Sequence, residues 1–172
     1  MRAQPAQVVA AVEPIPVLAA GGIATGAQVA AALLLGADGV LMGTRFLATE
    51  EAPWPPSFKQ AIVESDGHDT QLTDIPDIAR ATVWPGAFDR ARRNRLIEDW
   101  AGRENELRRH RSQVGEAMAR AAQEDDASYG ELNFGQAAAL IDSIESCSEL
   151  VPRLSEEASD LLAAGAGRLA EP

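Results

Sequence analysis

The sequence predicts an α/β fold, and one stretch near the N-terminus carries the observations behind this prediction. Two short, largely apolar runs, 15–20 and 38–42, flank an alanine-rich segment, and each run ends in glycine. Short apolar runs of this kind are typical of strands that are buried on both faces of a parallel sheet. The order strand, helix, strand therefore predicts one βαβ unit with a right-handed crossover.

Local signals place the helices of this unit. Residues 5–13 are typical of the end of a helix, which Pro14 closes. Thr25 and Gln28 have the spacing of a capping box, in which two side chains satisfy free amides of the first helical turn. We expect this helix to run to Leu35, with Gly36 as its left-handed stop.

After Glu51 the sequence is predicted to be helical, with no third strand. Ser57 and Gln60 form a second capping-box pattern, which predicts a helix to about Glu64. Residues 65–74 have the composition of a turn, and 124–133 that of an exposed loop. Further helices are expected over 88–123, with breaks at Gly102 and Gly115, over 134–144, and over 150–162, with Gly165 as the last stop.

Two parallel strands cannot bury both faces of their sheet without further elements. A complete (β/α)8 barrel has eight strands and needs at least ~200 residues. The sequence therefore predicts a C-terminal fragment of a TIM (β/α)8 barrel, supplying its last two strands. Residues 1–52 would form the last βαβ unit of that barrel, and residues 53–172 a helical C-terminal region that packs on it.

Composition limits the classes of partner. The net charge of -11 argues against binding to nucleic acid or to an anionic membrane surface. Cys147 is the only cysteine and cannot form an internal disulfide, which favours a reducing compartment. No apolar run approaches the ~20 residues that span a bilayer. A cytoplasmic location is expected.

The glycines at the strand ends suggest an anion site. Ligands of parallel α/β folds bind at the carboxyl ends of the strands, where Gly21 and Gly22 follow the first run and Gly43 follows the second. Glycine lets backbone amides approach an anion without interference from a Cβ atom, and the start of the following helix adds a favourable dipole. Together with Thr44, these residues predict a phosphate cradle. The alternative is that the glycines serve only tight turns.

The segment PVLAAGGIATGAQVAAALLLGADGVLMGTRFLATEEA resembles the last two strands of the nitronate monooxygenases, formerly called 2-nitropropane dioxygenases, which are FMN-dependent TIM barrels. The resemblance continues in DTQLTD, in RRNRLIEDW and in NFGQAAALIDSIESCSELVPRLSEEASDLL. It implies that Gly21 and Gly22 bind the FMN phosphate from the seventh strand. Leu41, Met42, Gly43 and Thr44 would bind it from the eighth.

Leu41 stands where the family usually has glutamine, which matters little if this position contributes only backbone. Arg45 lies beside the cradle in sequence, and its side chain could face either the phosphate or a carboxylate. In the family, the catalytic histidine and the residues under the flavin ring come from earlier strands. No catalytic residue is therefore assigned in this chain.

The resemblance implies FMN-dependent oxidation of alkyl nitronates or nitroalkanes by O2, with the nitro compound and O2 as the small-molecule partners. One alternative is an FMN-dependent enoyl-acyl-carrier-protein reductase, which has similar glycine motifs. Another is a truncated, catalytically silent fragment. A homo-oligomer and a complementing N-terminal half both remain open as partners.

The remaining reactive residue types favour structural roles. His68 lies in a turn with Asp66 and Asp69, whose spacing matches no Ca²⁺ loop, so no metal site is predicted. His110 is expected to be exposed, and Cys147 to be a structural thiol. The basic run is expected to form a salt-bridged, solvated helix rather than an anion site, and consists of Arg90, Arg92, Arg93 and Arg95. The tryptophans are expected to pack against the protein core, and these are Trp54, Trp84 and Trp100.

Overall fold

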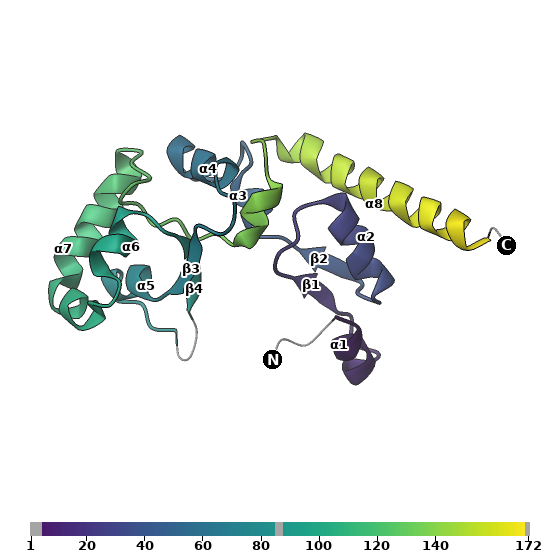
Figure 1. Ribbon diagram of the computed structural model, residues 1–172, viewed down its shortest axis with the longest axis horizontal. Helices are drawn as coiled ribbons and strands as arrows, with labels where there is room; N and C mark the ends of the chain where they lie inside the picture. The colour runs from purple at the N-terminus through teal and green to yellow at the C-terminus, as the bar shows by residue number, and fades with distance from the viewer. Residues whose placement is uncertain (1–4, 85–87, 171–172) are drawn as a thin grey trace.

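The computed structural model describes residues 5–84 and 88–170 (Figure 1). Along the chain the elements are α1 (Pro5–Val12), β1 (Leu18–Ala20), α2 (Gly26–Leu34), β2 (Gly39–Leu41), α3 (Thr44–Leu47), α4 (Pro56–Val63), β3 (Thr70–Thr73), α5 (Ile75–Ala79), β4 (Asp89–Arg92), α6 (Arg95–Trp100), α7 (Glu104–Gln123), the 3-10 helix η1 (Gln136–Leu140) and α8 (Cys147–Ala170). Figure 1 shows β1, β2 and α2 beneath α8 at one end of the molecule. At the other end, α5, α6 and α7 gather around β3 and β4.

The βαβ unit is confirmed. Strands β1 and β2 pair in parallel, with Leu18 opposite Gly39 and Ala20 opposite Leu41, and α2 makes the crossover. The Thr25–Gln28 capping box is present at the start of α2. Gly36 has φ +92°, the left-handed conformation that the predicted helix stop requires.

The two faces of this parallel sheet differ in burial. On one face Ala19 packs with Ala32 and Ala37 in a small core. On the other face Leu18 is 60% exposed and Leu41 is 63% exposed. Large apolar side chains in a strand normally face a core, so this face of the sheet is an unusually exposed apolar surface.

The expectation that only helices follow residue 53 is wrong. Strands β3 and β4 form an antiparallel pair, with Thr70 opposite Arg92 and Thr73 opposite Asp89. The first of these segments had the composition of a turn, and the second lay within a predicted helix. The α/β fold class is confirmed, but its C-terminal region is mixed rather than purely helical.

Several predicted helix boundaries also differ from the structure. Helix α4 begins at Pro56 without a side-chain cap, because the Ser57 hydroxyl donates instead to the Asp125 backbone oxygen, at 2.8 Å. Gly102, with φ +79°, separates α6 from α7 as predicted, whereas Gly115 lies inside an unbroken α7. Helix α8 continues through Gly165, and the predicted helix over 134–144 is only the short η1.

Two apolar cores hold the C-terminal region together. The first joins α4 to η1 through residues that include Phe58, Ile62 and Phe134. The second joins α5, α6 and α7 and includes Ile75, Leu96 and Leu107. Trp54 packs against the first core and Trp100 against the second, as predicted, while Trp84 is 60% exposed and is not a packing anchor.

Candidate functional site

The candidate site consists of two loops at the carboxyl edge of the parallel sheet. Gly21 and Gly22 follow β1, and Gly43 and Thr44 follow β2. Because the strands are parallel and in register, both loops leave the sheet at the same edge. The φ angles of Gly21 and Gly22 are +96° and +78°, so this turn needs residues without a Cβ atom.

The space above both loops is open. A Cβ atom added at Gly21, Gly22 or Gly43 would meet no other atom within 4 Å. Among the hydrogen bonds of the described residues, none has the amide N–H of Gly22 or Gly43 as its donor. Backbone amides without a protein acceptor, on glycines with open space at the Cβ position, are the kind of donors that phosphate oxygens use, so these residues are compatible with a phosphate group.

Gln28 fixes the shape of the first loop. Its Oε1 accepts from the backbone N–H of Ala24 at 2.8 Å and of Thr25 at 3.3 Å. Its Nε2 donates to the Gly22 carbonyl at 2.7 Å. The Gly22 carbonyl is therefore held by the start of α2, and its peptide group is fixed in orientation.

The second loop is fixed through Thr44. Its hydroxyl oxygen accepts from the Gly135 N–H at 2.9 Å, which ties the loop to the start of η1. Met42 is one of the residues that line an apolar cavity of about 200 Å³, with others that include Val29 and Leu154. Leu41 does not line this cavity and is 63% exposed, so the two residues lie in different surroundings.

The N-terminus of α2 differs from expectation. The Gly26 N–H donates to the Glu157 carboxylate at 3.0 Å, across from α8. A carboxylate at this position already uses part of the favourable helix dipole. Part of the helix dipole that was expected to favour an anion is thus used by Glu157 of the protein itself.

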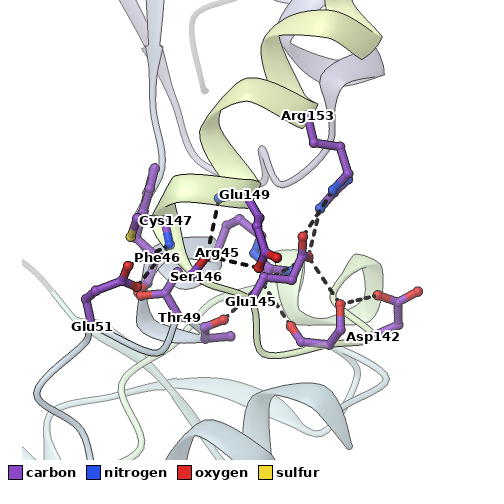
Figure 2. Close-up of polar contacts among 12 residues, drawn as sticks. Arg45, Phe46, Thr49, Glu51, Asp142, Glu145, Ser146, Cys147, Glu149 and Arg153 are labelled. Atoms are coloured by element: carbon purple, nitrogen blue, oxygen red, sulfur yellow. Dashed lines mark hydrogen bonds and ion pairs between the residues drawn. The ribbon is translucent and has the colours of Figure 1, made fainter.

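The two alternatives for Arg45 are resolved in favour of the carboxylate. Its side chain is 2% exposed, and its Nη2 donates to the carbonyls of Ala48 and Ser143, each at 2.9 Å. The same Nη2 lies 3.6 Å from Glu145 Oε1, among the contacts of Figure 2. Burial lowers the pKa of Arg45, an effect that Glu145 opposes. Among the described residues, its buried Nε has no hydrogen-bond partner.

Glu145 connects Arg45 to α8. Arg153 donates from Nη2 to Glu145 Oε1 at 2.8 Å and from Nε to Oε2 at 3.1 Å, a two-point contact. The Arg153 hydrogen bonds lower the pKa of Glu145, so this carboxylate is ionised at neutral pH. Arg153 also donates to Glu157 Oε1 at 2.8 Å.

The other residues considered from sequence lie away from this edge of the sheet. His68 and His110 are exposed. In 5–84 and 88–170, no three His, Cys, Asp or Glu side chains are grouped to hold a metal ion, and no helix is long and apolar enough to cross a membrane. The basic run lies on β4 and α6 rather than on one helix, and two of its members pair with carboxylates: Arg92 with Asp69 at 2.8 Å and Arg95 with Asp99 at 3.8 Å.

The chain is similar to nitronate monooxygenases and to two proteins of known structure. Nitronate monooxygenase npaC of Metarhizium robertsii is 33% identical over 156 residues, which is 86% of this chain and 43% of that protein. The structure of FabK from Thermotoga maritima matches with a TM-score of 0.78 and 32% identity over 95% of this chain and 50% of that one. Nitroalkane oxidase from Streptomyces ansochromogenes matches with a TM-score of 0.74 and 31% identity, over 93% of this chain and 44% of that one.

The chain thus spans about half, or less, of the length of these proteins. A sequence profile of the family described as nitronate monooxygenase matches residues 4–157, which is most of the chain. The matched range includes both glycine loops and the Arg45–Glu145–Arg153–Glu157 contacts. The chain therefore belongs to the nitronate monooxygenase family of oxidoreductases.

Proposed function

We propose that this chain binds the phosphate of FMN between its two glycine loops and acts as part of a nitronate monooxygenase. The observation that carries the proposal is the pair of open loops, at Gly21–Gly22 and Gly43–Thr44, on one edge of a parallel sheet. Family membership supports a flavin as the cofactor. Free backbone amides bind a phosphate group, and FMN is a flavin that carries one, so the loops favour FMN. Leu41 and Met42 would contribute backbone only.

The chain's own residues would bind and orient the cofactor. The amides of Gly22 and Gly43 would donate to phosphate oxygens, while Gln28 and Thr44 keep their loops in place. When bound, FMN supplies the redox chemistry that oxidises an alkyl nitronate and passes electrons to O2. The group that takes the substrate proton is not assigned to any residue of this chain.

We further propose that another polypeptide segment completes the site. Leu18 and Leu41 are exposed on one face of the sheet. Within the described residues, β1 and β2 pair only with each other, so the outer side of each strand has no strand partner. Further parallel strands would cover this face and pair with these edges, as in the predicted TIM (β/α)8 barrel. That segment would supply the flavin-ring contacts and the proton acceptor.

The likeness to FabK keeps an FMN-dependent enoyl-acyl-carrier-protein reductase as the second candidate. Both candidates need the same phosphate cradle and differ in electron donor. A catalytically silent chain is the third reading, and the uncovered sheet face is the observation that favours it.

One experiment separates the three candidates. The chain is purified alone and after co-expression with the N-terminal part of the Metarhizium robertsii protein that precedes the matched region. A nitronate monooxygenase will retain FMN and consume O2 with propyl-2-nitronate. Oxidation of NADPH with a 2-enoyl thioester, and no O2 uptake with the nitronate, would establish the reductase instead. Neither activity, with no flavin retained, would contradict both enzyme assignments.

A further inference from the structure

A continuous series of polar contacts joins the two glycine loops through α8. It starts at Arg45, which follows Thr44 of the second loop, and passes through Glu145 at 3.6 Å to Arg153 at 2.8 Å. It then continues from Arg153 to Glu157 at 2.8 Å. Glu157 ends the series at the Gly26 N–H, in the first turn of α2, which follows the first loop.

Arg153 is the middle member of this series. Its guanidinium contacts Glu145 with two nitrogens and Glu157 with the third, so one planar cation holds two carboxylates in a fixed relative position (Figure 2 shows the Glu145 side of this contact). One of these carboxylates is bound to the element after the first loop and the other to the element after the second.

Helix α8 packs against α2, and it carries buried apolar side chains as well as this ion-pair series. Leu150, Leu154 and Ala158 of α8 are 0%, 5% and 4% exposed. Arg153 itself is half-buried, with a side chain that is 42% exposed. We expect α8 to stay docked when this charge is lost, because its buried apolar side chains remain and ion pairs of a partly exposed side chain contribute modestly to folding.

The charges of Glu145, Arg153 and Glu157 also affect how strongly an anion binds in the cradle. Glu157 places a carboxylate at the N-terminus of α2, the element that follows Gly21 and Gly22. Without Arg153, the Glu157 carboxylate would stand without its ion-pair partner at the start of α2 and would repel a phosphate, while Glu145 would keep only Arg45, 3.6 Å away. With Arg153, the four side chains of the series carry no net charge instead of one negative charge.

We propose that Arg153 is a positioning residue of the phosphate cradle, setting the two loops relative to each other through Glu145 and Glu157. This inference rests on the proposed function, because it assigns to α8 a role in holding the FMN phosphate. It makes α8 part of the cofactor site although no residue of α8 lies in either loop.

The test compares Arg153→Met with Arg103→Met. Arg103 is the matched control, since it also contacts a carboxylate with two nitrogens, at Glu106, and its side chain is 52% exposed. FMN and riboflavin, which lacks the phosphate, are titrated into each full 172-residue chain by flavin fluorescence. We expect Arg153→Met to raise the Kd for FMN by about tenfold with little change for riboflavin, and Arg103→Met to change neither.

Arg153→Lys is the conservative variant. It restores the charge but not the planar fork, so we expect a Kd for FMN between those of wild type and Arg153→Met. An unchanged Kd for FMN in Arg153→Met, or an equal loss for FMN and riboflavin, would overturn the positioning role.

Amide hydrogen exchange keeps this test separate from that of the proposed function. If the wild-type chain binds no FMN, the proposed function fails for this chain, and exchange over residues 21–26 and 43–45 decides the inference. Faster exchange in both loops of Arg153→Met, and not of Arg103→Met, supports the link. Unchanged exchange in both loops overturns it.

Discussion

The buried guanidinium of Arg45 lies 3.6 Å from the carboxylate of Glu145 and connects the loop after β2 to the segment that precedes α8. Arg45 immediately follows the proposed phosphate loop, yet its nitrogens face backbone carbonyls and a carboxylate. An arginine beside a cradle can thus stabilise the loop without contacting the anion. The local fold of the second loop depends on residues far along the chain.

Arg45→Met should strongly destabilise the protein. It removes hydrogen bonds to the Ala48 and Ser143 carbonyls and leaves them without this donor, which we expect to lower the free energy of unfolding by about 2–4 kcal/mol. Urea denaturation measures the change. Arg95→Met is the control, because Arg95 is 73% exposed and its pair with Asp99 spans 3.8 Å, so a change below about 0.5 kcal/mol is expected. Equal changes in the two variants would contradict this role.

Gly22→Asp should abolish FMN binding through the charge of its new side chain, and not only through strain in the backbone. The new carboxylate would enter the open space above the loop and repel the phosphate, and we expect the Kd for FMN to rise at least about a hundredfold. Gly102→Asp is the matched control, since Gly102 also has a positive φ, +79°, and open space around it, but lies between α6 and α7. The prediction fails if both variants bind FMN equally well in a flavin titration.

Asn94→Ala should loosen the region around β4 and α6. The Asn94 side chain caps α6 by accepting from the Ile97 N–H, and its Nδ2 donates to the carbonyls of Ala127 and Gly130. Loss of these contacts should lower the free energy of unfolding by about 2 kcal/mol. Thermal unfolding followed by circular dichroism measures this. FMN affinity should be unchanged, since Asn94 touches neither glycine loop. A loss of FMN binding in Asn94→Ala would contradict the view that the phosphate cradle is independent of the region around β4 and α6.

Glu131 should make stability depend on pH. Burial raises the pKa of Glu131, Arg80 opposes the shift, and Asp77 and Asp89 add to it. A group whose pKa is higher in the folded protein stabilises the fold when protonated, and this contribution is lost as the pH rises through the folded pKa. Glu131→Gln should therefore become more stable relative to wild type as the pH is raised from about 4.5 to 7.

Urea denaturation across this pH range provides the measurement. Glu116→Gln, which alters an exposed carboxylate of α7, controls for the general effect of reducing the net charge of -11. A difference between Glu131→Gln and wild type that does not vary with pH would contradict the assigned direction of the pKa shift.

Features set by neighbouring residues could be predicted from the sequence. The Thr25–Gln28 box, the stop at Gly36 and the break at Gly102 each depend on a few adjacent residues. The same type of signal failed at Ser57, because two prolines set the start of α4 and the Ser57 hydroxyl bonds to Asp125, 68 residues away. Gly165 failed as a stop, since glycine inside a helix costs only about 1 kcal/mol.

The β3–β4 pair could not be predicted by the same reasoning. Its segments, TQLT and DRAR, are short and polar, and a strand of this composition is stabilised by its pairing partner rather than by its own pattern. In the candidate site, motif and position predict the glycines and Thr44, and the structure places their two loops after adjacent parallel strands. The contacts of Glu145, Arg153 and Glu157 were missed, because nothing local in α8 shows that its charges reach the start of α2.

The most direct test of the phosphate cradle is a titration of the ¹⁵N-labelled chain with FMN, followed by amide NMR shifts. We expect the amides of Gly22, Gly43 and Thr44 to shift with FMN and not with riboflavin. Shifts confined to the basic residues of β4 and α6, or no saturable shift in either glycine loop, would contradict it.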